Sequence, residues 1–433
     1  MAAHLATRQH PAPFFTRWLA SARGWGYAGG KRDLRFDLLR GFAVFAMVVD
    51  HIGGWRSPFY LLTGGDRFFV SAAEGFVFLS GLLMGMINGG LIRRGDVGAA
   101  LTKVLRRAGM LYAITVGLTF VIAILPAVLR LSWAPDLRGV TIIDYIVGVL
   151  TLHRTANLVD VMLLYTVLVL AAEPILLLLQ HGYTRLVLIG SWLLWLVWQG
   201  RPQSADVWPI AGEELFTVSA WQVLFVTALV IGFHRRRLEG AFRAIASPQA
   251  LVLSGTVLAG LIALFMAHLA PLTALTGRDY DTLIEWFFAK NDVAPGRIIT
   301  FAALFVFLVA LTTLLWEPLV RAFGWLLLPF GQNALSAYVI HIFVIGALSS
   351  LRPIILGAHE TIVTAALYQL AGIMIVWSII RLRPVVAASL EHLESVQTPT
   401  IGTGGVAMPT TETVSVDIQF ARAEARHGVD MLR

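Results

Sequence analysis

The sequence predicts an all-α membrane protein, a polytopic bundle of about ten transmembrane helices, and three observations lead to this prediction. Hydrophobic residues make up 57% of the 433 residues and charged residues only 14%, whereas a soluble domain averages about a quarter charged residues. The mean hydropathy is +0.75. Apolar stretches near the roughly 20 residues that a bilayer crossing requires recur along most of the chain.

Ten segments have the length and composition of membrane spans. They are residues 36–53, 70–90, 104–126, 158–180, 183–199, 219–234, 250–270, 298–316, 333–350 and 361–380. An eleventh apolar segment, "TIIDYIVGVLTL" at 141–152, is too short for a full crossing, which needs about 20 residues. We interpret it as a re-entrant or interfacial segment.

The distribution of basic residues sets the orientation of these spans. Basic side chains crowd the connection between the second and third spans and recur at 235–237. The positive-inside rule places both groups in the cytoplasm, so the number of crossings between them must be even. Four long segments satisfy this condition and a fifth crossing at 141–152 would violate it. Continued along the chain, the rule predicts ten spans with both termini cytoplasmic.

The remaining regions are predicted to be loops, a leader and a tail. Residues 1–30 have no continuous apolar core and are predicted to form a cytoplasmic leader rather than a signal peptide. The membrane domain is expected over residues 31–383, with external loops at 200–218 and 271–297. The polar, Thr-rich segment 392–433 is predicted to be a disordered cytoplasmic tail.

Composition also excludes several kinds of chemistry. The chain has no cysteine, so thiolate catalysis, disulfides and cysteine-bound metals are excluded. The sequence shows no phosphate-binding loop, Rossmann fingerprint or metal-binding cluster, and no metal is expected. The net charge of +7 serves topology in a membrane protein and does not predict a nucleic-acid partner. The oligomeric state is not determined by these features.

The first span, "FDLLRGFAVFAMVVDHIGG", carries ionisable residues at both ends. Asp37 and Arg40 are expected near the cytoplasmic face, where they can form an ion pair at the boundary or where Arg40 can extend to the interface. Asp50 and His51 are expected roughly 20 Å higher, near the outer face. The second span runs downward and begins with Glu74, which we therefore expect at the depth of His51.

An acid and an imidazole at one depth suit proton transfer. His51 can accept a proton from a hydroxyl and pass it to a leaving group. Its second nitrogen needs an orienting partner, and Glu74 is predicted to be that partner because Asp50, the neighbour of His51, diverges from it on the helix. Asp50 could instead bind a sugar hydroxyl or anchor the third or fifth helix. His51, Glu74 and Asp50 are thus the predicted catalytic residues.

Other polar residues are expected in the same membrane. Asp160, Trp221 and Gln222 enter from the outer side of their spans and are predicted to bind the acceptor substrate. His341 is expected near the middle of its span, as a hydrogen-bonded packing residue or as part of a substrate route. Ionisable residues in such positions usually face a bundle interior or a water-filled cavity.

The cytoplasmic arginines have two interpretations. Topology alone explains them, but they also suit an anionic donor such as coenzyme A, whose phosphates favour arginine. On the second interpretation the donor enters from inside and its thioester arm rises through the bundle. The predicted donor-binding residues are Arg40, Arg93, Arg94, Arg106, Arg107 and His341.

Several blocks resemble one family. "RDLRFDLLRGFAVFAMVVDHIGG", "SAAEGFVFLSGLLMG" and "WQVLFVTALVIG" are similar to blocks of the OpgC-like membrane acyltransferases, named for the enzyme that succinylates osmoregulated periplasmic glucans. "GQNALSAYVIH" resembles a late helix of the wider acyltransferase-3 type. The resemblance extends from about residue 31 to 383.

The resemblance implies an enzyme of the bacterial inner membrane. It implies ten spans and transfer of an acyl group, with succinyl the expected one, from cytoplasmic acyl-CoA to a hydroxyl of a periplasmic glucan or related glycan, without a tightly bound cofactor. By position it implicates Arg40, Asp50, His51, Glu74 and His341. The alternative is a transporter of a small anionic solute or glycan precursor, although transporter sites tend to lie at the midplane between inverted repeats.

Overall fold

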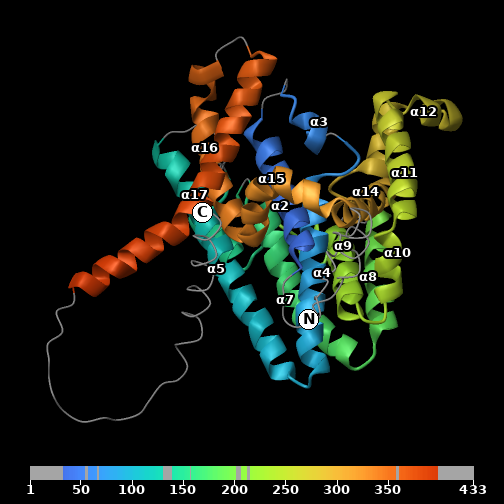
Figure 1. The fold of residues 1–433 in the computed structure, drawn as a ribbon, viewed down its shortest axis with the longest axis horizontal. Coiled ribbons are helices and arrows are strands. Elements are labelled where there is room, and N and C mark those ends of the chain that lie inside the picture. The colour runs from blue at the N-terminus through green and yellow to red at the C-terminus, as the bar shows by residue number, and fades with distance from the viewer. Residues whose placement is uncertain are drawn as a thin grey trace, which may run out of the picture.

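The computed structural model describes residues 33–53, 57–65, 68–129, 139–156, 158–200, 206–211, 215–356 and 360–397. These residues form a helical bundle, and the β contact found among them is an isolated bridge between Arg154 and Ala211. Figure 1 shows the helices gathered around α2, α4, α7 and α9. The predicted leader and residues 398–433 of the predicted tail lie outside the described residues.

Each of the ten predicted spans contains a helix. These helices are α2 (Leu34–Ile52), α4 (Ala72–Arg93), α5 (Val97–Leu129), α7 (Asp160–Gln180), α8 (Thr184–Gln199), α9 (Val218–Phe233), α11 (Pro248–Met266), α14 (Pro295–Leu314), α16 (Ala334–Leu356) and α17 (Ile362–Gln397). α17 therefore continues into the segment predicted to be a disordered tail.

Among the described residues, seven of these helices are long and apolar enough to cross a membrane: α4, α5, α7, α11, α14, α16 and α17. α8 and α9 are apolar but have only 16 residues each. α2 has 19 residues and contains Arg35, Asp37, Arg40 and Asp50. The protein is thus an all-helical membrane protein with seven candidate spans, and the crossing number of about ten stays a prediction.

Shorter helices occupy the connections. The predicted short segment contains α6 (Ile142–Leu150), whose Ile142 and Ile143 are largely exposed. The predicted loop 271–297 contains most of α12 (Ala270–Thr276), α13 (Tyr280–Leu283) and the π-helical turn η1 (Ile284–Phe288). The other connecting helices are α3 (Tyr60–Thr63), α10 (Glu239–Ile245) and α15 (Trp316–Gln332).

Glycines allow α4 and α9 to pack closely. A side chain added at Gly81 or Gly85 of α4 would overlap the carbonyl oxygen of Phe225 or Leu229 in α9, and one at Gly232 would overlap that of Leu82. Small residues repeated every fourth position let helix backbones approach in a membrane. The two helices therefore run side by side in the same direction at the centre of the bundle.

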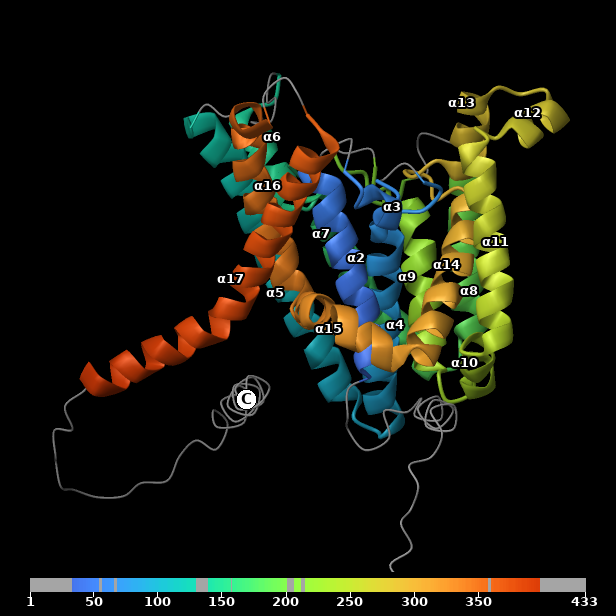
Figure 2. The same ribbon diagram turned by 45° about the horizontal axis from the view of Figure 1, so that its top comes forward.

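The two predicted cytoplasmic arginine groups lie at one end of the bundle. Arg93, at the end of α4, donates a hydrogen bond to the carbonyl oxygen of Phe233, at the end of α9 and beside residues 235–237. Figure 2 shows this end at the bottom, with α10, while α3, α6, α12 and α13 lie at the opposite end. The structure confirms that the two groups share an end, whereas the side of the membrane that this end faces stays a prediction.

Candidate active site

A pair of histidines joins the end of α2 to the first part of α16. His51 Nδ1 lies 3.1 Å from His341 Nε2, and the two rings stack with centroids 5.4 Å apart and an interplanar angle of 20°. His341 is only 1% exposed, whereas His51 is half-buried. Gly53, with φ +81°, ends α2 two residues after His51, so His51 lies in the last turn of the helix.

The contacts of His341 determine which nitrogens carry protons in the neutral pair. His341 Nδ1 bonds to the backbone carbonyl oxygen of Tyr338, which can only accept, so this nitrogen must be the donor. His341 Nε2 is then the acceptor and receives the proton of His51 Nδ1. In this tautomer, His51 Nε2 has a lone pair and no proton, which is the form a general base requires.

Tyr338 connects this pair to α7. Its ring is buried and contacts that of His341 at 4.6 Å between centroids. Its hydroxyl donates to the carbonyl oxygen of Leu158 at 2.8 Å, and Leu158 has a φ of +67°, which a non-glycine residue rarely adopts. The hydrogen bond thus holds an unfavourable backbone turn at the start of α7 beside the histidine pair.

α17 supports the same end of α2. Gln369 is fully buried, and its Nε2 donates to the carbonyl oxygen of Val49 at 3.0 Å. Carbonyl oxygens in the last turn of a helix lack a regular helical donor. The Gln369 amide supplies a donor to one of these oxygens, two residues before His51. Gln369 was not predicted from the sequence, although a glutamine within an apolar segment of 20 residues is a signal of a buried polar contact.

The predicted pairing of Glu74 with His51 is wrong. Both carboxylate oxygens of Glu74 are engaged elsewhere: Arg297 Nε donates to Oε1 at 2.7 Å, and the backbone and hydroxyl of Ser71 donate to Oε2 at 3.0 and 2.6 Å. Glu74 is 0% exposed and Arg297 only 4%. Glu74 therefore serves as a helix cap and one half of a buried ion pair between α4 and α14.

The reason for this error is helix depth. Gly75 faces Ala43, since a Cβ placed on Gly75 would lie 3.8 Å from the Cβ of Ala43. His51 is eight residues beyond Ala43, which is about 12 Å further along the helix axis. The end of α2 thus extends beyond the start of α4, and the two residues that the sequence placed at one depth lie at different heights.

A charged residue adjacent to His51 has a contact of its own. The preceding residue, Asp50, accepts a hydrogen bond at 2.6 Å from the hydroxyl of Thr63 at the end of α3. This contact ties Asp50 to the short connecting helix that follows α2, and anchoring of the third or fifth predicted span by Asp50 stays a prediction.

Comparison with known proteins places the chain in a family. Residues 32–386 match the family model described as OpgC protein. The chain belongs to the OpgC protein family. No curated protein and no solved structure matches it. Membership of the OpgC family indicates a membrane protein of the glucan-modifying acyltransferase type.

The predicted donor-binding arginines of this OpgC family member are distributed over several places. Arg107 Nε donates to the hydroxyl of Tyr165 at 3.1 Å, and the Tyr165 ring contacts Phe76, which stacks on Tyr338. Arg94 and Arg106 are exposed. Arg93 binds the end of α9, as described above. Donor binding by these residues stays a prediction.

Arg40 lies on α2, where the helix crosses α15. The neighbouring Gly41 makes room for this crossing, because a side chain there would overlap the carbonyl oxygen of Leu327. Arg40 is half-buried. Arg40 therefore lies in the first half of α2, about 16 Å from His51 along the helix axis.

The predicted acceptor-binding residues are engaged in packing contacts. Gln222 accepts from the Ser191 hydroxyl at 2.6 Å and donates to the Ser191 carbonyl at 2.8 Å, which joins α9 to α8. Trp221 is 0% exposed and donates to the carbonyl oxygen of Leu215. Asp160 is buried and its Oδ1 accepts from the backbone of Val161. A role of Asp160, Trp221 and Gln222 in substrate binding stays a prediction.

Proposed function

We propose that this protein is a membrane-bound O-acyltransferase that moves an acyl group, with succinyl the expected one, from acyl-CoA to a hydroxyl of a periplasmic glucan or related glycan. The observation that carries the proposal is the hydrogen-bonded chain from the Tyr338 carbonyl through His341 to His51, which leaves His51 Nε2 as a base. Membership of the OpgC family supports the same reaction class.

In the proposed reaction, His51 Nε2 removes the proton of the attacking sugar hydroxyl. The oxygen then forms a bond to the thioester carbonyl carbon, and the carbon–sulfur bond breaks. The departing thiolate takes the proton from His51 Nε2, so the products are an ester and free coenzyme A and the imidazole is regenerated. Base and acid work by one positioned histidine contributes about 10²–10⁴-fold to a rate.

His341 acts as the positioning residue. While His51 carries the transferred proton, its Nδ1–H still donates to His341 Nε2, and this acceptor stabilises the imidazolium and fixes the ring orientation. A carboxylate has this role in the serine-hydrolase triad. A neutral imidazole is a weaker electrostatic partner but leaves no additional charge buried in the membrane.

The experiment compares esterified glycans from cells with and without the intact chain. Cells that produce the full chain, its His51→Ala variant or no chain are extracted for periplasmic and surface glycans, and base-labile acyl esters are quantified by mass spectrometry. We expect the variant to lose ester content about 100-fold or more with unchanged membrane levels of the protein. Full ester content in the variant contradicts the proposal, and a transporter would alter glycan or solute distribution while esters persist.

The orientation is part of the proposal. We propose ten crossings in the bacterial inner membrane, with both termini and the end carrying Arg93 and residues 235–237 in the cytoplasm and the histidine pair toward the periplasm. The sharing of one end by both arginine groups supports it. Because the chain has no cysteine, single cysteines can be introduced without background. A membrane-impermeant thiol reagent should label Thr63→Cys from the periplasm and not Arg94→Cys, and the reverse result contradicts the orientation.

A further inference from the structure

A cavity lies at the opposite end of the bundle from the histidine pair. It has a volume of about 830 Å³ and is bounded by the turn before α8, by α8 itself and by the last turns of α9. A second cavity of about 350 Å³ shares Gly182, Thr184, His234 and Arg237 with it and extends to the end of α4. Volumes of this size are typical of sites for small molecules.

One part of this double cavity is cationic. The basic residues that line it are Arg93, Arg185, Arg236, Arg237 and His234, and none of the described residues that line it is acidic. Among the described residues, no ion pair neutralises Arg185, Arg236 or Arg237, whereas nearby Arg243 is paired with Glu239. A concentration of unneutralised arginines around a hollow favours an anion, and guanidinium groups match phosphate geometry.

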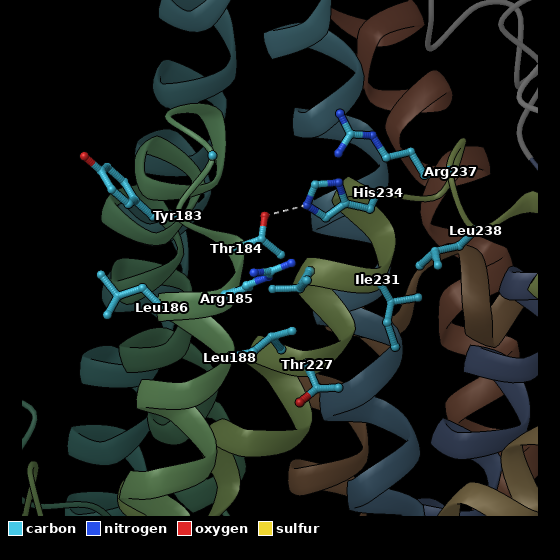
Figure 3. Close-up of a pocket in the computed structure, with 12 residues that line it drawn as sticks. Tyr183, Thr184, Arg185, Leu186, Leu188, Thr227, Ile231, His234, Arg237 and Leu238 are labelled. Atoms are coloured by element: carbon cyan, nitrogen blue, oxygen red, sulfur yellow. Dashed lines mark hydrogen bonds between the residues drawn. The ribbon is translucent and has the colours of Figure 1, made fainter.

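The other part is apolar. Leu186, Leu188, Val230, Ile231 and Leu238 line it. Figure 3 shows His234 and Arg237 near one end of the cavity, with Leu188, Thr227 and Ile231 further along the helices. The exposed face of α8, including Leu186 at 60% and Ile189 at 57%, faces lipid in a membrane-spanning bundle. The cavity thus combines an anion-binding end with a hydrocarbon-lined end that adjoins the lipid.

Thr227 adds a polar group at the deeper end. Its buried hydroxyl has no hydrogen-bond partner among the described residues, although buried polar groups are normally hydrogen-bonded. Thr227 and His234 are seven residues apart, so they lie on one face of α9 about 10 Å apart along its axis. A ligand that contacts both His234 and Thr227 must carry a hydrogen-bond acceptor about 10 Å from its anionic group, toward the middle of the membrane.

We propose that this cavity binds the phosphate of an anionic phospholipid, with Arg185 and Arg237 holding the headgroup and Thr227 donating to an ester carbonyl below it. A phosphodiester with two ester-linked chains matches the cationic end, the deeper hydroxyl and the apolar walls. A soluble phosphate ester shares the headgroup chemistry but has no hydrocarbon to place against Leu188 and Ile231. The proposal does not depend on the acyltransferase reaction.

The experiment measures lipid retained by the full chain. Purified protein in detergent is offered phosphatidylglycerol and phosphatidylcholine in equal amounts, and bound lipids are counted by native mass spectrometry. We expect a preference for phosphatidylglycerol. Each basic residue near an anionic headgroup contributes about fivefold, so Arg185→Gln with Arg237→Gln should lower the preference about 25-fold.

Matched variants distinguish an effect of the cavity arginines from an effect of the protein's overall charge. Arg243→Gln with Arg321→Gln removes the same charge from two exposed arginines that are already paired with Glu239 and Glu317, and we expect these changes to leave the preference intact. Thr227→Val should weaken retention a few fold. Ile231→Trp should block the cavity without a change of charge, with folding checked by size-exclusion elution.

Three outcomes overturn the proposal. The first is a wild-type protein that shows no preference between the two lipids. The second is an equal loss in the cavity and control double variants. The third is binding of soluble coenzyme A, or of inorganic phosphate, to protein held in phosphatidylcholine nanodiscs with the same dependence on Arg185 and Arg237. That result assigns the site to a soluble phosphate ester.

Discussion

The histidine pair and the Glu74–Arg297 ion pair are two contacts between ionisable side chains of different helices, yet they differ in how completely they are satisfied. In the ion pair, both oxygens of Glu74 are occupied by Arg297 and Ser71, and the carboxylate is fully buried. In the histidine pair, His341 is saturated while His51 retains an unprotonated nitrogen and partial exposure. An ionisable residue in a membrane helix is costly, and its unfilled bonding capacity separates a reactive group from a structural one.

The largest expected effect is the loss of stability when the Glu74–Arg297 ion pair is broken. Arg297→Met leaves Glu74 buried without its cation, and loss of one partner of a buried pair costs about 3–5 kcal/mol. We expect a corresponding decrease in unfolding free energy, measured by denaturant titration in detergent. Adding Glu74→Gln should recover most of the loss, because a buried pair replaced by neutral groups is often close to neutral in stability.

A more exposed ion pair provides the control for that measurement. Arg352 and Glu360 lie 2.9 Å apart with side chains 33% and 20% exposed, and pairs of this kind contribute about 0–1 kcal/mol. Arg352→Met should therefore cost far less than Arg297→Met. Similar losses in the two variants would show that the Glu74–Arg297 contact is not the buried structural pair described above.

The second prediction tests the reactive side of the comparison. His341→Leu removes the acceptor of His51 Nδ1–H, so we expect acyl transfer to fall about 100-fold with a small change in stability. His341→Gln offers an oxygen in place of Nε2 and should recover part of the rate. The measurement is the pH profile of ester formation by purified protein. Protonation of His51 governs its low-pH side, so loss of positioning should alter that side more in His341→Leu than in His341→Gln. Equal rates for Gln and Leu would contradict the positioning role.

The apolar pattern of the sequence was sufficient to locate the ten helices that lie in the predicted spans, because the hydrophobicity of a segment is a local property. α15 was missed because Glu317, Arg321, Gly324 and Pro329 interrupt its apolar residues. That helix packs against α2 through Gly331, where a side chain would overlap the carbonyl oxygen of Asp37. The importance of such a glycine depends on a helix distant in sequence, so the sequence alone did not reveal it.

The sequence identified several residues of the candidate site but did not show which of them contact one another. His51 and His341 were both identified, but they were assigned different depths because the helix ends were assumed to be level. Arg297, the partner of Glu74, was counted within the external loop 271–297, whereas it belongs to the first turn of α14. Contacts between helices depend on their offsets along the membrane normal, which hydropathy does not encode.

The smallest predicted effect concerns His234, which follows the last residue of α9 and lines the cavity. Burial lowers the pKa of His234 below its usual value of 6.5, and the charges of Arg237 and Arg93 lower it further. The unfolded chain therefore binds more protons at this residue than the folded chain, so its contribution to stability is present above pH 6.5 and is lost as the pH falls. We expect His234→Gln to reduce the acid-induced loss in thermal stability between about pH 7.5 and 5.5.

A bound anion should change this result in a defined direction. The negative charge of a phosphate beside His234 favours the imidazolium, so it raises the pKa toward or above the usual value and diminishes the acid-induced loss. Wild-type protein with phosphatidylglycerol should thus lose less stability on acidification than protein with phosphatidylcholine, and the difference should disappear in His234→Gln. If the lipid difference persists in that variant, another group responds to the anion. In that case the role of His234 is structural, through the hydrogen bond of its Nε2 with the Thr184 hydroxyl at 2.8 Å.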